Sequence, residues 1–178
     1  MIIGLQGYGG AGKSEVARYL ESEFRFKRRH IKTPLADMFA VLLRAKFPGI
    51  SDSDLHEIID GSRKRDPIPE LGGRTSTEIQ QFLGTEFGRD FIDPDLWFGI
   101  WAAWAKSQKR AVQESVRFAN EGSICDEVWE IRRPGTGPVN GHSSEAMPCT
   151  PSLILDNAGT LPELFFQVHC AMKARGLS

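Results

Sequence analysis

The first twenty residues, MIIGLQGYGGAGKSEVARYL (residues 1–20), decide how the chain begins to fold. Residues 1–5 form a short apolar run, which is typical of a buried parallel strand. From Ser14 onward, apolar side chains such as Val16 and Leu20 recur at helical spacing, while polar side chains take the other side of the helix. The stretch therefore predicts a strand that passes through a glycine-rich turn into an amphipathic helix.

The turn between strand and helix, GYGGAGKS (residues 7–14), fits the spacing G-x-x-x-x-G-K-[ST] of the phosphate-binding P-loop. Its glycines allow positive φ and leave backbone N–H groups free to surround a phosphate, and the following helix offers the positive end of its dipole. Lys13 is predicted to reach the β- and γ-phosphates, and the Ser14 hydroxyl is the predicted Mg²⁺ ligand. The alternative is a plain glycine-rich turn with a solvated lysine. The residues predicted to bind the triphosphate are Gly9, Gly10, Ala11, Gly12, Lys13 and Ser14.

The composition restricts the class of protein. The 178 residues are 40% hydrophobic and 25% charged, an ordinary balance for one globular domain with a sizeable core. A net charge of -1 argues against general nucleic-acid binding, which needs a basic face, and no apolar run is long enough to cross a membrane. The three cysteines form no C-x-x-C pair, and the N-terminus lacks the basic flank and long apolar core of a signal peptide. We therefore expect a cytoplasmic protein with neither nucleic acid nor membrane as a partner.

The middle of the chain is rich in helix signals. Thr33 has the place of an N-cap and Pro34 that of a first helical residue, and residues 75–78 have the spacing of a capping box. Residues 61–73 are interpreted as a loop, whose basic cluster at 63–65 either meets an anion or is solvated. The expected helices begin at about residues 33, 51, 75 and 96.

Two apolar faces are expected on these helices. On the helix from residue 75, the apolar face consists of Ile79, Phe82 and Leu83. On the helix from residue 96, tryptophans recur at helical spacing: Trp97, Trp101 and Trp104. Such a stripe is more often core or a subunit interface than a base-stacking platform. A homodimer is therefore one expected assembly.

The last third of the chain alternates strands and helices. A capping box at residues 160–163 begins the last helix, and Gly176 ends it. The expected strands cover about residues 111–116, 127–132 and 152–155. This alternation after the P-loop predicts an α/β fold class, a P-loop NTPase fold of three layers around a parallel sheet.

Two long segments do not fit a simple crossover between strands. Residues 34–108, approximately, are expected to form a helical insertion over the carboxyl ends of the strands. Residues 133–151, approximately, contain much glycine, proline, serine and threonine and are expected to form a flexible lid loop. A single P-loop domain with such an insertion and lid is organised like a nucleoside monophosphate kinase, in which the insertion holds the acceptor and the lid excludes water.

Short stretches along nearly the whole chain resemble, in the same order, the phage-type deoxynucleoside monophosphate kinases. Besides the P-loop they are Thr33-Pro34-Leu35, QFLGTEFGR (81–89), Leu96-Trp97, VRFANE (116–121), Arg132-Arg133-Pro134, HSSE (142–145) and NAGTL (157–161). The resemblance implies transfer of the γ-phosphoryl group of ATP to a deoxynucleoside monophosphate (dNMP), with Mg²⁺ as a cofactor. Two other interpretations stay open: another small-molecule P-loop kinase, resembling dephospho-coenzyme A kinase, and a nucleotide-binding protein without activity.

The resemblance and the chemistry of phosphoryl transfer suggest roles outside the P-loop. With Lys13, Arg132 and Arg133 are the predicted catalytic residues, because an arginine at the mouth of the lid would neutralise charge on the transferred group. The alternative for each is a surface arginine. Asn157 and Gly159 are expected to lie along the adenine of ATP. The residues predicted to bind the acceptor are Arg74, Gln81, Glu86, Arg89, Trp97 and Arg117, and the lid or its hinge is expected to include His142, Ser144 and Glu145.

The acceptor residues have different expected roles. The guanidinium of Arg89 suits the acceptor phosphate, although an ion pair with Glu86 would explain it as well. Gln81 is expected to read a base edge, and Trp97 is expected to pack on the base or the sugar. No residue pattern indicates which bases are accepted.

Two positions depart from the family pattern. Ser115 stands where the family usually has the aspartate of D-V-R-F, and Ala36 stands where it usually has a lysine. Glu114 is adjacent to Ser115, but successive strand residues point to opposite faces, so it is not expected to replace the aspartate. Either departure would alter specificity or reduce activity, and neither touches the P-loop.

Overall fold

The computed structural model describes residues 1–137, 147 and 149–177. The chain folds as two units, each with its own hydrophobic core. Unit 1 consists of Met1–His30 and Trp101–Ser178, and unit 2 consists of Ile31–Ile100. The second unit therefore covers most of the range in which the sequence predicts a helical insertion.

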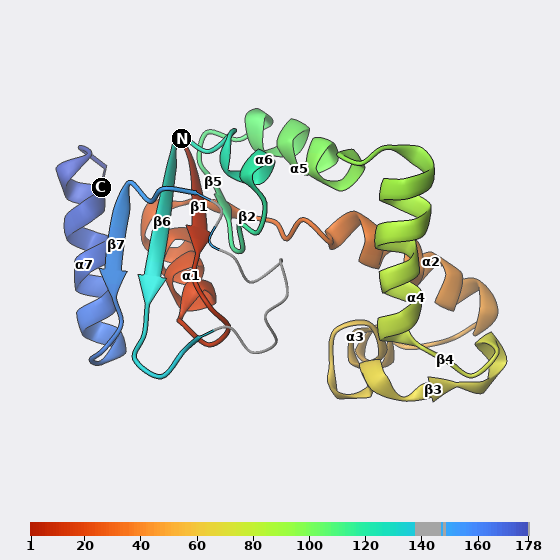
Figure 1. The fold of residues 1–178 in the computed structure, drawn as a ribbon. Helices are drawn as coiled ribbons and strands as arrows, with labels where there is room; N and C mark the ends of the chain where they lie inside the picture. The colour runs from red at the N-terminus through yellow and green to blue at the C-terminus, as the bar shows by residue number, and fades with distance from the viewer. Residues whose placement is uncertain (138–146, 148, 178) are drawn as a thin grey trace. The chain divides into compact units, whose positions relative to one another are not determined.

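Unit 1 contains a five-stranded parallel sheet with the order β2-β5-β1-β6-β7 (Figure 1). The strands are β1 (Ile2–Gln6), β2 (Lys27–Arg28), β5 (Ala111–Gln113), β6 (Glu127–Arg132) and β7 (Leu153–Asp156). The central strand β1 leads directly into the P-loop. From β1 the chain crosses over to β2 at one edge of the sheet, whereas from β6 it crosses over to β7 at the other edge, so the loop lies where the direction of the connections reverses. This sheet confirms the predicted P-loop α/β fold; β2 carries no sequence pattern and was not predicted.

The main core of unit 1 lies on one face of this sheet. Helices α1 (Lys13–Phe24) and α7 (Leu161–Ala174) cover that face. Ile3 and Leu5 alternate along β1 with Gly4 and Gln6, so the apolar side chains meet α1 and α7 whereas Gln6 belongs to the other face. Burial of this face stabilises the sheet and fixes the position of the P-loop between β1 and α1.

The rest of unit 1 comprises short elements after the helix α5 (Leu96–Ser107), which crosses from unit 2 into unit 1. The segment after β5 contains the short helix α6 (Ala119–Gly122). A Cβ on Gly4 would lie 2.7 Å from a methyl carbon of Val116 and 2.8 Å from Sγ of Cys125. The segment after β5 therefore covers the second face of β1, and only glycine fits beneath it.

Unit 2 is mostly helical and carries a separate core. Its elements are α2 (Thr33–Lys46), α3 (Asp52–Ile59), η1 (Ser62–Arg65), β3 (Pro67–Ile68), η2 (Pro69–Leu71), β4 (Arg74–Thr75), α4 (Ser76–Phe82) and η3 (Leu83–Ile92), followed by the start of α5. Its buried core consists of Phe39, Leu43, Leu55, Ile58, Ile59 and Ile68. Both predicted capping boxes form, with Glu78 accepting from the backbone N–H of Thr75 and Glu163 from that of Thr160 in unit 1.

Three sequence predictions for unit 2 need correction. Residues 61–73 form two 3₁₀ turns and a small antiparallel pair, β3 with β4, instead of a plain loop. Thr33 is the first residue of α2 and Lys32 is its N-cap. The helix from residue 76 continues as a π-helix over Leu83–Ile92, and this wider register leaves Phe82 56% exposed instead of on a shared apolar face.

Two of the three tryptophans of the predicted stripe belong to the cores. Trp97 and Trp101 are buried, and Trp104 is half-buried beneath the guanidinium of Arg29. The indole N–H of Trp101 donates to the carbonyl oxygen of Arg29 over 2.7 Å. These contacts support the core interpretation for Trp97 and Trp101, and the homodimer stays a prediction.

Candidate functional site: a nucleotide cradle in unit 1

The P-loop requires glycine for two physical reasons. Gly7, Gly10 and Gly12 have φ angles of 141°, 76° and 108°, in the region that other residues rarely adopt. In addition, a Cβ on Gly7 would lie 2.5 Å from the carbonyl oxygen of Ile131, and one on Gly12 would lie 2.6 Å from Nδ2 of Asn157. The loop therefore packs against β6 at Gly7 and against the segment that follows β7 at Gly12, and neither position has room for a side chain.

The lysine of the motif lies over the loop that precedes it. Nζ of Lys13 donates hydrogen bonds to the carbonyl oxygens of Gly7, over 2.7 Å, and Tyr8, over 2.8 Å. Burial lowers the pKa of this ammonium below its ordinary value, and the positive charge of Arg117 lowers it further. A partly desolvated cation at this place interacts strongly with a phosphate that enters the loop.

The first turn of α1 offers backbone donors to an anion. Gly12, the N-cap residue, has a left-handed conformation and supplies no side-chain cap. The first N–H groups of a helix have no partner within the helix, and they carry the positive end of its dipole. Ser14, the second residue of α1, is exposed, so its hydroxyl is accessible beside these donors. The cradle therefore suits a polyphosphate, and it suits Mg²⁺ held by Ser14 together with phosphate oxygens.

Asn157 connects the P-loop with the end of β7. It is 6% exposed, and its Nδ2 donates to the carbonyl oxygen of Ala11 over 2.8 Å. Its own backbone N–H donates to the carbonyl oxygen of Arg132 over 2.7 Å. The structure thus gives Asn157 the role of supporting the loop, while its contact with adenine stays a prediction.

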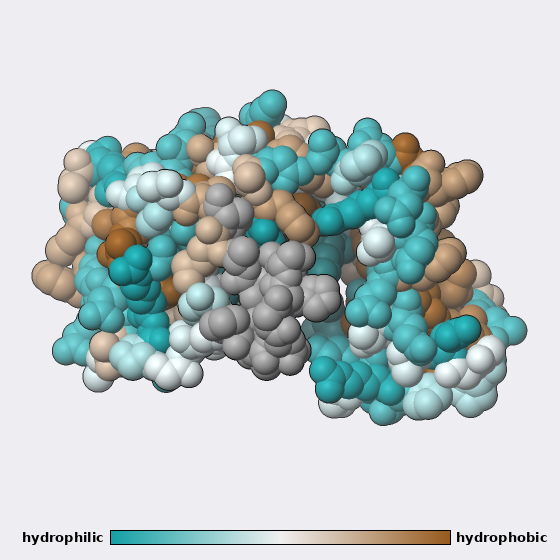
Figure 2. Space-filling model, in the orientation of Figure 1, coloured by the Kyte–Doolittle hydropathy of each residue, from teal (hydrophilic) through white to brown (hydrophobic). Residues whose placement is uncertain are grey.

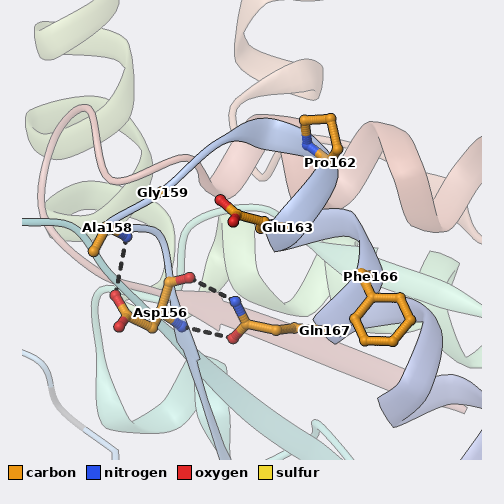
Figure 3. A pocket seen from close by; sticks show the side chains of 7 residues that line it. All are labelled: Asp156, Ala158, Gly159, Pro162, Glu163, Phe166 and Gln167. Carbon is orange, nitrogen blue, oxygen red and sulfur yellow. Dashed lines mark hydrogen bonds between the residues drawn. The ribbon is translucent and has the colours of Figure 1, made fainter.

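A surface hollow of about 530 Å³ lies beside the predicted adenine segment (Figure 3). It is lined by Asp156, Ala158, Gly159, Pro162, Glu163, Phe166 and Gln167. Two hydrogen bonds join Asp156 and Gln167 in the wall of this hollow. The side-chain amide of Gln167 accepts from the backbone N–H of Asp156 over 3.0 Å and donates to the backbone carbonyl of Asp156 over 2.7 Å. A Cβ on Gly159 would collide with the Glu163 carboxylate of the capping box, so a larger residue here would displace that carboxylate.

The predicted catalytic arginines lie at the end of β6, Arg132 as its last residue and Arg133 directly after it, and they have different partners. Nη1 of Arg133 donates to the carbonyl oxygen of Gly10 over 3.3 Å, so this side chain lies against the P-loop. Nε of Arg132 donates to the carboxylate of Glu130, which is 5% exposed and raises the pKa of the guanidinium. Arg132 is therefore oriented by Glu130, a residue that was not predicted as part of the site.

Buried amides accompany Glu130 at the carboxyl ends of the strands. Nε2 of Gln6 donates to the carbonyl oxygen of Cys149 over 2.8 Å and lies 3.5 Å from Glu130 Oε2. Among the described residues, Oε1 of Gln6 and both amide atoms of Gln113 lack a protein partner. A buried amide without a hydrogen-bond partner costs free energy. The sequence signal that could have identified these residues is the occurrence of polar side chains near the ends of apolar strands.

Ser115, which departs from the family pattern, lies in contact with Arg117. Nε of Arg117 donates to Oγ of Ser115 over 3.2 Å, and its backbone N–H donates to Glu121 over 2.7 Å. The carboxylate of Glu114 pairs instead with Arg28 of β2, over 3.0 Å. Glu114 is thus engaged elsewhere, and a neutral hydroxyl takes the place of the aspartate beside Arg117.

The remaining predicted acceptor residues belong to unit 2. Gln81 and Glu86 are exposed, Arg89 is half-buried, and Arg74 pairs with Glu78 over 3.5 Å. Trp97 is 6% exposed, and its indole N–H donates to the carbonyl oxygen of Gly84 over 2.8 Å. The structure therefore gives Trp97 a packing role within unit 2, and its contact with a base or sugar stays a prediction.

The other predicted binding features have plain outcomes. Arg63 of the basic cluster pairs with Asp54 over 3.3 Å, and in Figure 2 the part of unit 2 around α3 and η1 is mostly hydrophilic. His142, Ser144 and Glu145 lie outside the described residues. Within the described ranges, no cluster of three or more acidic, histidine or cysteine side chains would hold a metal ion, and no helix is long and apolar enough to span a membrane.

Comparisons with known proteins agree with the fold and the motifs. No family model matches the chain. The chain is 26% identical, over 188 residues covering 94% of each protein, to a protein of Acanthamoeba polyphaga mimivirus named "Putative deoxynucleotide monophosphate kinase". This relative confirms the resemblance that the short motifs predict.

Two solved structures were compared with the chain, both at low identity. TT1252 from Thermus thermophilus has a TM-score of 0.52 and 17% identity, covering 98% of this chain and 97% of that one. A sugar kinase from Janibacter sp. HTCC2649 has a TM-score of 0.45 and 13% identity, covering 99% of this chain and 95% of that one. The likeness to TT1252 shows that the same fold extends over nearly the whole chain.

Proposed function

We propose that this protein transfers the γ-phosphoryl group of ATP to a dNMP, giving a dNDP and ADP. The observation that carries the proposal is the cradle itself: left-handed glycines, a partly desolvated lysine and an uncapped helix N-terminus directly after the central strand. The name of the mimivirus relative supports the choice of acceptor.

ATP is the donor that this cradle fits best. Lys13 and the N–H groups of the loop would hold its β- and γ-phosphates, and Ser14 would hold Mg²⁺, which would supply charge neutralisation at the phosphates. The hollow beside Gly159 and Phe166 supports a place for adenine next to the loop, because Phe166 offers an aromatic ring that is 69% exposed. The hydrogen bond between Asn157 and Ala11 would hold the segment after β7 at a fixed distance from the P-loop, and so from the phosphates bound there.

Phosphoryl transfer needs alignment and neutralisation of developing charge more than covalent chemistry. Arg133, which lies against Gly10, would approach the γ-phosphate, and Arg132 would join it from the neighbouring position. Glu130 would restrict Arg132 to one orientation, which lowers the entropy that the guanidinium loses when it binds the phosphate.

The acceptor would be held mainly by unit 2. Arg89 is proposed to bind its phosphate, Gln81 and Glu86 are proposed to contact the base or sugar, and Arg117 of unit 1 would contribute a further cation. The bases accepted are left to experiment. We further propose that the protein acts in the cytoplasm on small molecules, and a homodimer is testable by sedimentation.

A second candidate is a nucleotide-binding protein without phosphoryl transfer. It is favoured by Ser115, because the contact between Arg117 and Ser115 lacks the carboxylate that the family pattern places there. This candidate predicts ATP binding without turnover, and it predicts that Ser115→Asp creates activity.

The deciding experiment is ADP release from Mg-ATP with dAMP, dCMP, dGMP and dTMP, with ribonucleotides and dephospho-coenzyme A as competing acceptors. Lys13→Ala should abolish turnover, whereas the control Lys173→Ala, an exposed lysine on α7, should leave it unchanged. Turnover with a dNMP that Lys13→Ala abolishes supports the proposal. Turnover with dephospho-coenzyme A alone, or ATP binding without any turnover, would overturn it.

A further inference from the structure

The π-helix η3 is the feature of unit 2 that the proposed function does not yet explain. It covers Leu83–Ile92, which contains Glu86 and Arg89 and directly follows the end of α4 with Gln81. Figure 1 draws α4 and η3 as one continuous helical ribbon. A π-helical register of this length is rare, and π segments inside helices occur frequently at functional sites.

The exposed residues of η3 lie on both sides of the buried Gly88: Thr85 and Glu86 before it, and Asp90, Phe91 and Ile92 after it. In an α-helix, residues three and four apart share a face, so residues five apart, such as Thr85 and Asp90, would diverge. With hydrogen bonds from residue i to i+5, such as the 2.9 Å bond between the Asp93 N–H and the Gly88 carbonyl, Thr85 and Asp90 share one face. Gln81, in the preceding helix α4, is exposed four residues before Thr85, and Glu86 is exposed next to it.

One side chain occupies the inner side of this segment. The indole N–H of Trp97 donates to the carbonyl oxygen of Gly84 over 2.8 Å. A Cβ on Gly88 would lie 2.4 Å from Nε1 of Trp97 and 2.6 Å from two of its ring carbons, Cε2 and Cζ2. Gly88 is buried, so the ring is seated directly on the helix backbone.

The connection to α5 fixes where this ring lies. Oδ1 of Asp93 accepts from the N–H of Asp95 over 2.8 Å, and the carbonyl oxygen of Asp93 accepts from the N–H of Leu96 over 3.0 Å. These bonds form a tight turn, so α5 starts at a defined position with Trp97 as its second residue. The indole is therefore held by the turn on one side and by Gly84 and Gly88 on the other.

We propose that Trp97 is a positioning residue: its indole holds Leu83–Ile92 in the π register that brings Thr85 and Asp90 onto one exposed face for the acceptor nucleotide, next to Glu86. Thr85 and Asp90 thereby become candidates for selecting the acceptor, together with Gln81 of α4. In Figure 2 the side of this helical segment that faces the viewer is largely hydrophilic. This inference rests on the proposed function, since the face is assigned to the acceptor.

The test compares two glycine substitutions in unit 2. Gly88→Ala places a methyl group against the buried indole, whereas Gly99→Ala, on α5, meets no atom within 4 Å and serves as the matched control. We expect Gly88→Ala to raise the KM for the dNMP about tenfold or more, because small displacements of positioned groups have effects of this size, and to leave the KM for ATP unchanged. Gly99→Ala should change neither value.

Trp97→Phe provides the second variant in case Gly88→Ala fails to fold. It keeps a ring but removes the donor to Gly84, and it should shift the KM for the dNMP in the same direction by a smaller factor. Amide hydrogen exchange between residues 83 and 93 should accelerate in both variants and not in Gly99→Ala. An unchanged KM for the dNMP, or an equal rise in the KM for the dNMP and the KM for ATP, would overturn the positioning role.

The same experiments separate this inference from the proposed function. Absence of turnover by the wild-type protein with every dNMP would overturn the proposed function, and with it the assignment of the face to an acceptor. Hydrogen exchange then still judges the register: acceleration only in Gly88→Ala and Trp97→Phe supports it, and exchange identical to that of the wild type refutes it.

Discussion

The P-loop and the π-helix both depend on glycines, but for different reasons. In the P-loop, Gly12 has a φ of 108°, a conformation that favours glycine. It belongs to the spacing G-x-x-x-x-G-K-[ST], which identifies the loop from the sequence alone. In the π-helix, Gly88 is helical, and it is required only because the indole of Trp97 lies against it. The comparison teaches that a conformational requirement leaves a local sequence pattern, whereas a packing requirement depends on a residue elsewhere in the chain.

The largest expected effect tests the conformational side of this comparison. Gly12→Ala forces a left-handed conformation on alanine and places its Cβ 2.6 Å from Asn157, while the control Gly99→Ala, outside the P-loop, meets no atom within 4 Å. We expect Gly12→Ala to weaken ATP binding about a hundredfold, because the loop must shift away from the phosphates. Isothermal titration with Mg-ATP measures the effect, and equal affinities of the two variants would contradict it.

The contact between Glu130 and Arg132 tests the packing side of the comparison within unit 1, because no motif marks Glu130. Glu130→Gln removes the charge that orients Arg132, and we expect kcat to fall about tenfold with little change in the KM for ATP. Arg132→Ala should lower kcat by a smaller factor in the Glu130→Gln variant than in the wild-type protein, because the two residues act as a pair. Glu70→Gln, an exposed glutamate, is the control. Strictly additive losses would show that Glu130 does not act through Arg132.

A smaller effect concerns the charge on Lys13. Its pKa is lowered by burial and then by Arg117, so the ammonium loses its proton at a lower pH than an ordinary lysine, and ATP affinity should decline early on the alkaline side. Arg117→Gln removes a neighbouring positive charge and should move this decline to higher pH. ATP affinity as a function of pH, with Arg18→Gln as the control, measures the shift.

The same pKa has a defined consequence for stability. The unfolded chain binds the Lys13 proton more tightly than the folded one, so the free energy of unfolding rises with pH between the folded and the ordinary pKa. A decline of ATP affinity that moves to lower pH in Arg117→Gln would mean that this side chain does not repel the Lys13 proton.

The smallest expected effect sharpens the packing side. A Cβ on Gly84 would lie 3.1 Å from Cδ1 of Leu35, the end of a side chain that can yield. Gly84→Ala should change the free energy of unfolding by less than about 1 kcal/mol, because improved helix propensity offsets the tighter contact. Urea denaturation measures this, and a loss as large as that of Gly88→Ala would mean that Gly84 is equally restricted by packing.

The sequence predicts best what local patterns encode. The P-loop, the capping boxes at Thr75 and Thr160, and the alternation of strands with helices lie within short windows, and all are confirmed. The two-residue strand β2 has no pattern, since it pairs with β5 at two positions only. The π register was missed because its hydrogen bonds span five residues instead of four, a difference that leaves little trace in the sequence pattern. The contact that selects it comes from Trp97, which lies beyond the segment itself.

The candidate site divides in the same way. Lys13, Ser14 and the glycines follow from the motif, and Arg133 is indeed beside the loop. Glu130 and Gln113 had no motif to mark them, because their significance comes from lying beside β1 in the sheet. Asn157 was predicted for adenine, while its visible contact is with the loop carbonyl of Ala11.

The strand order has a consequence for how the protein folds during synthesis. Strand β1 is made first, yet Ile2 pairs with Ala111 and Ile3 pairs with Glu127, so both of its partners emerge from the ribosome much later. Pairings so distant in sequence slow folding, and the growing chain must keep an apolar strand unpaired in the meantime. Asn157, which braces the loop, is made later still. Unit 2, whose core lies within Ile31–Ile100, has all of its partners earlier and is the part best placed to fold first.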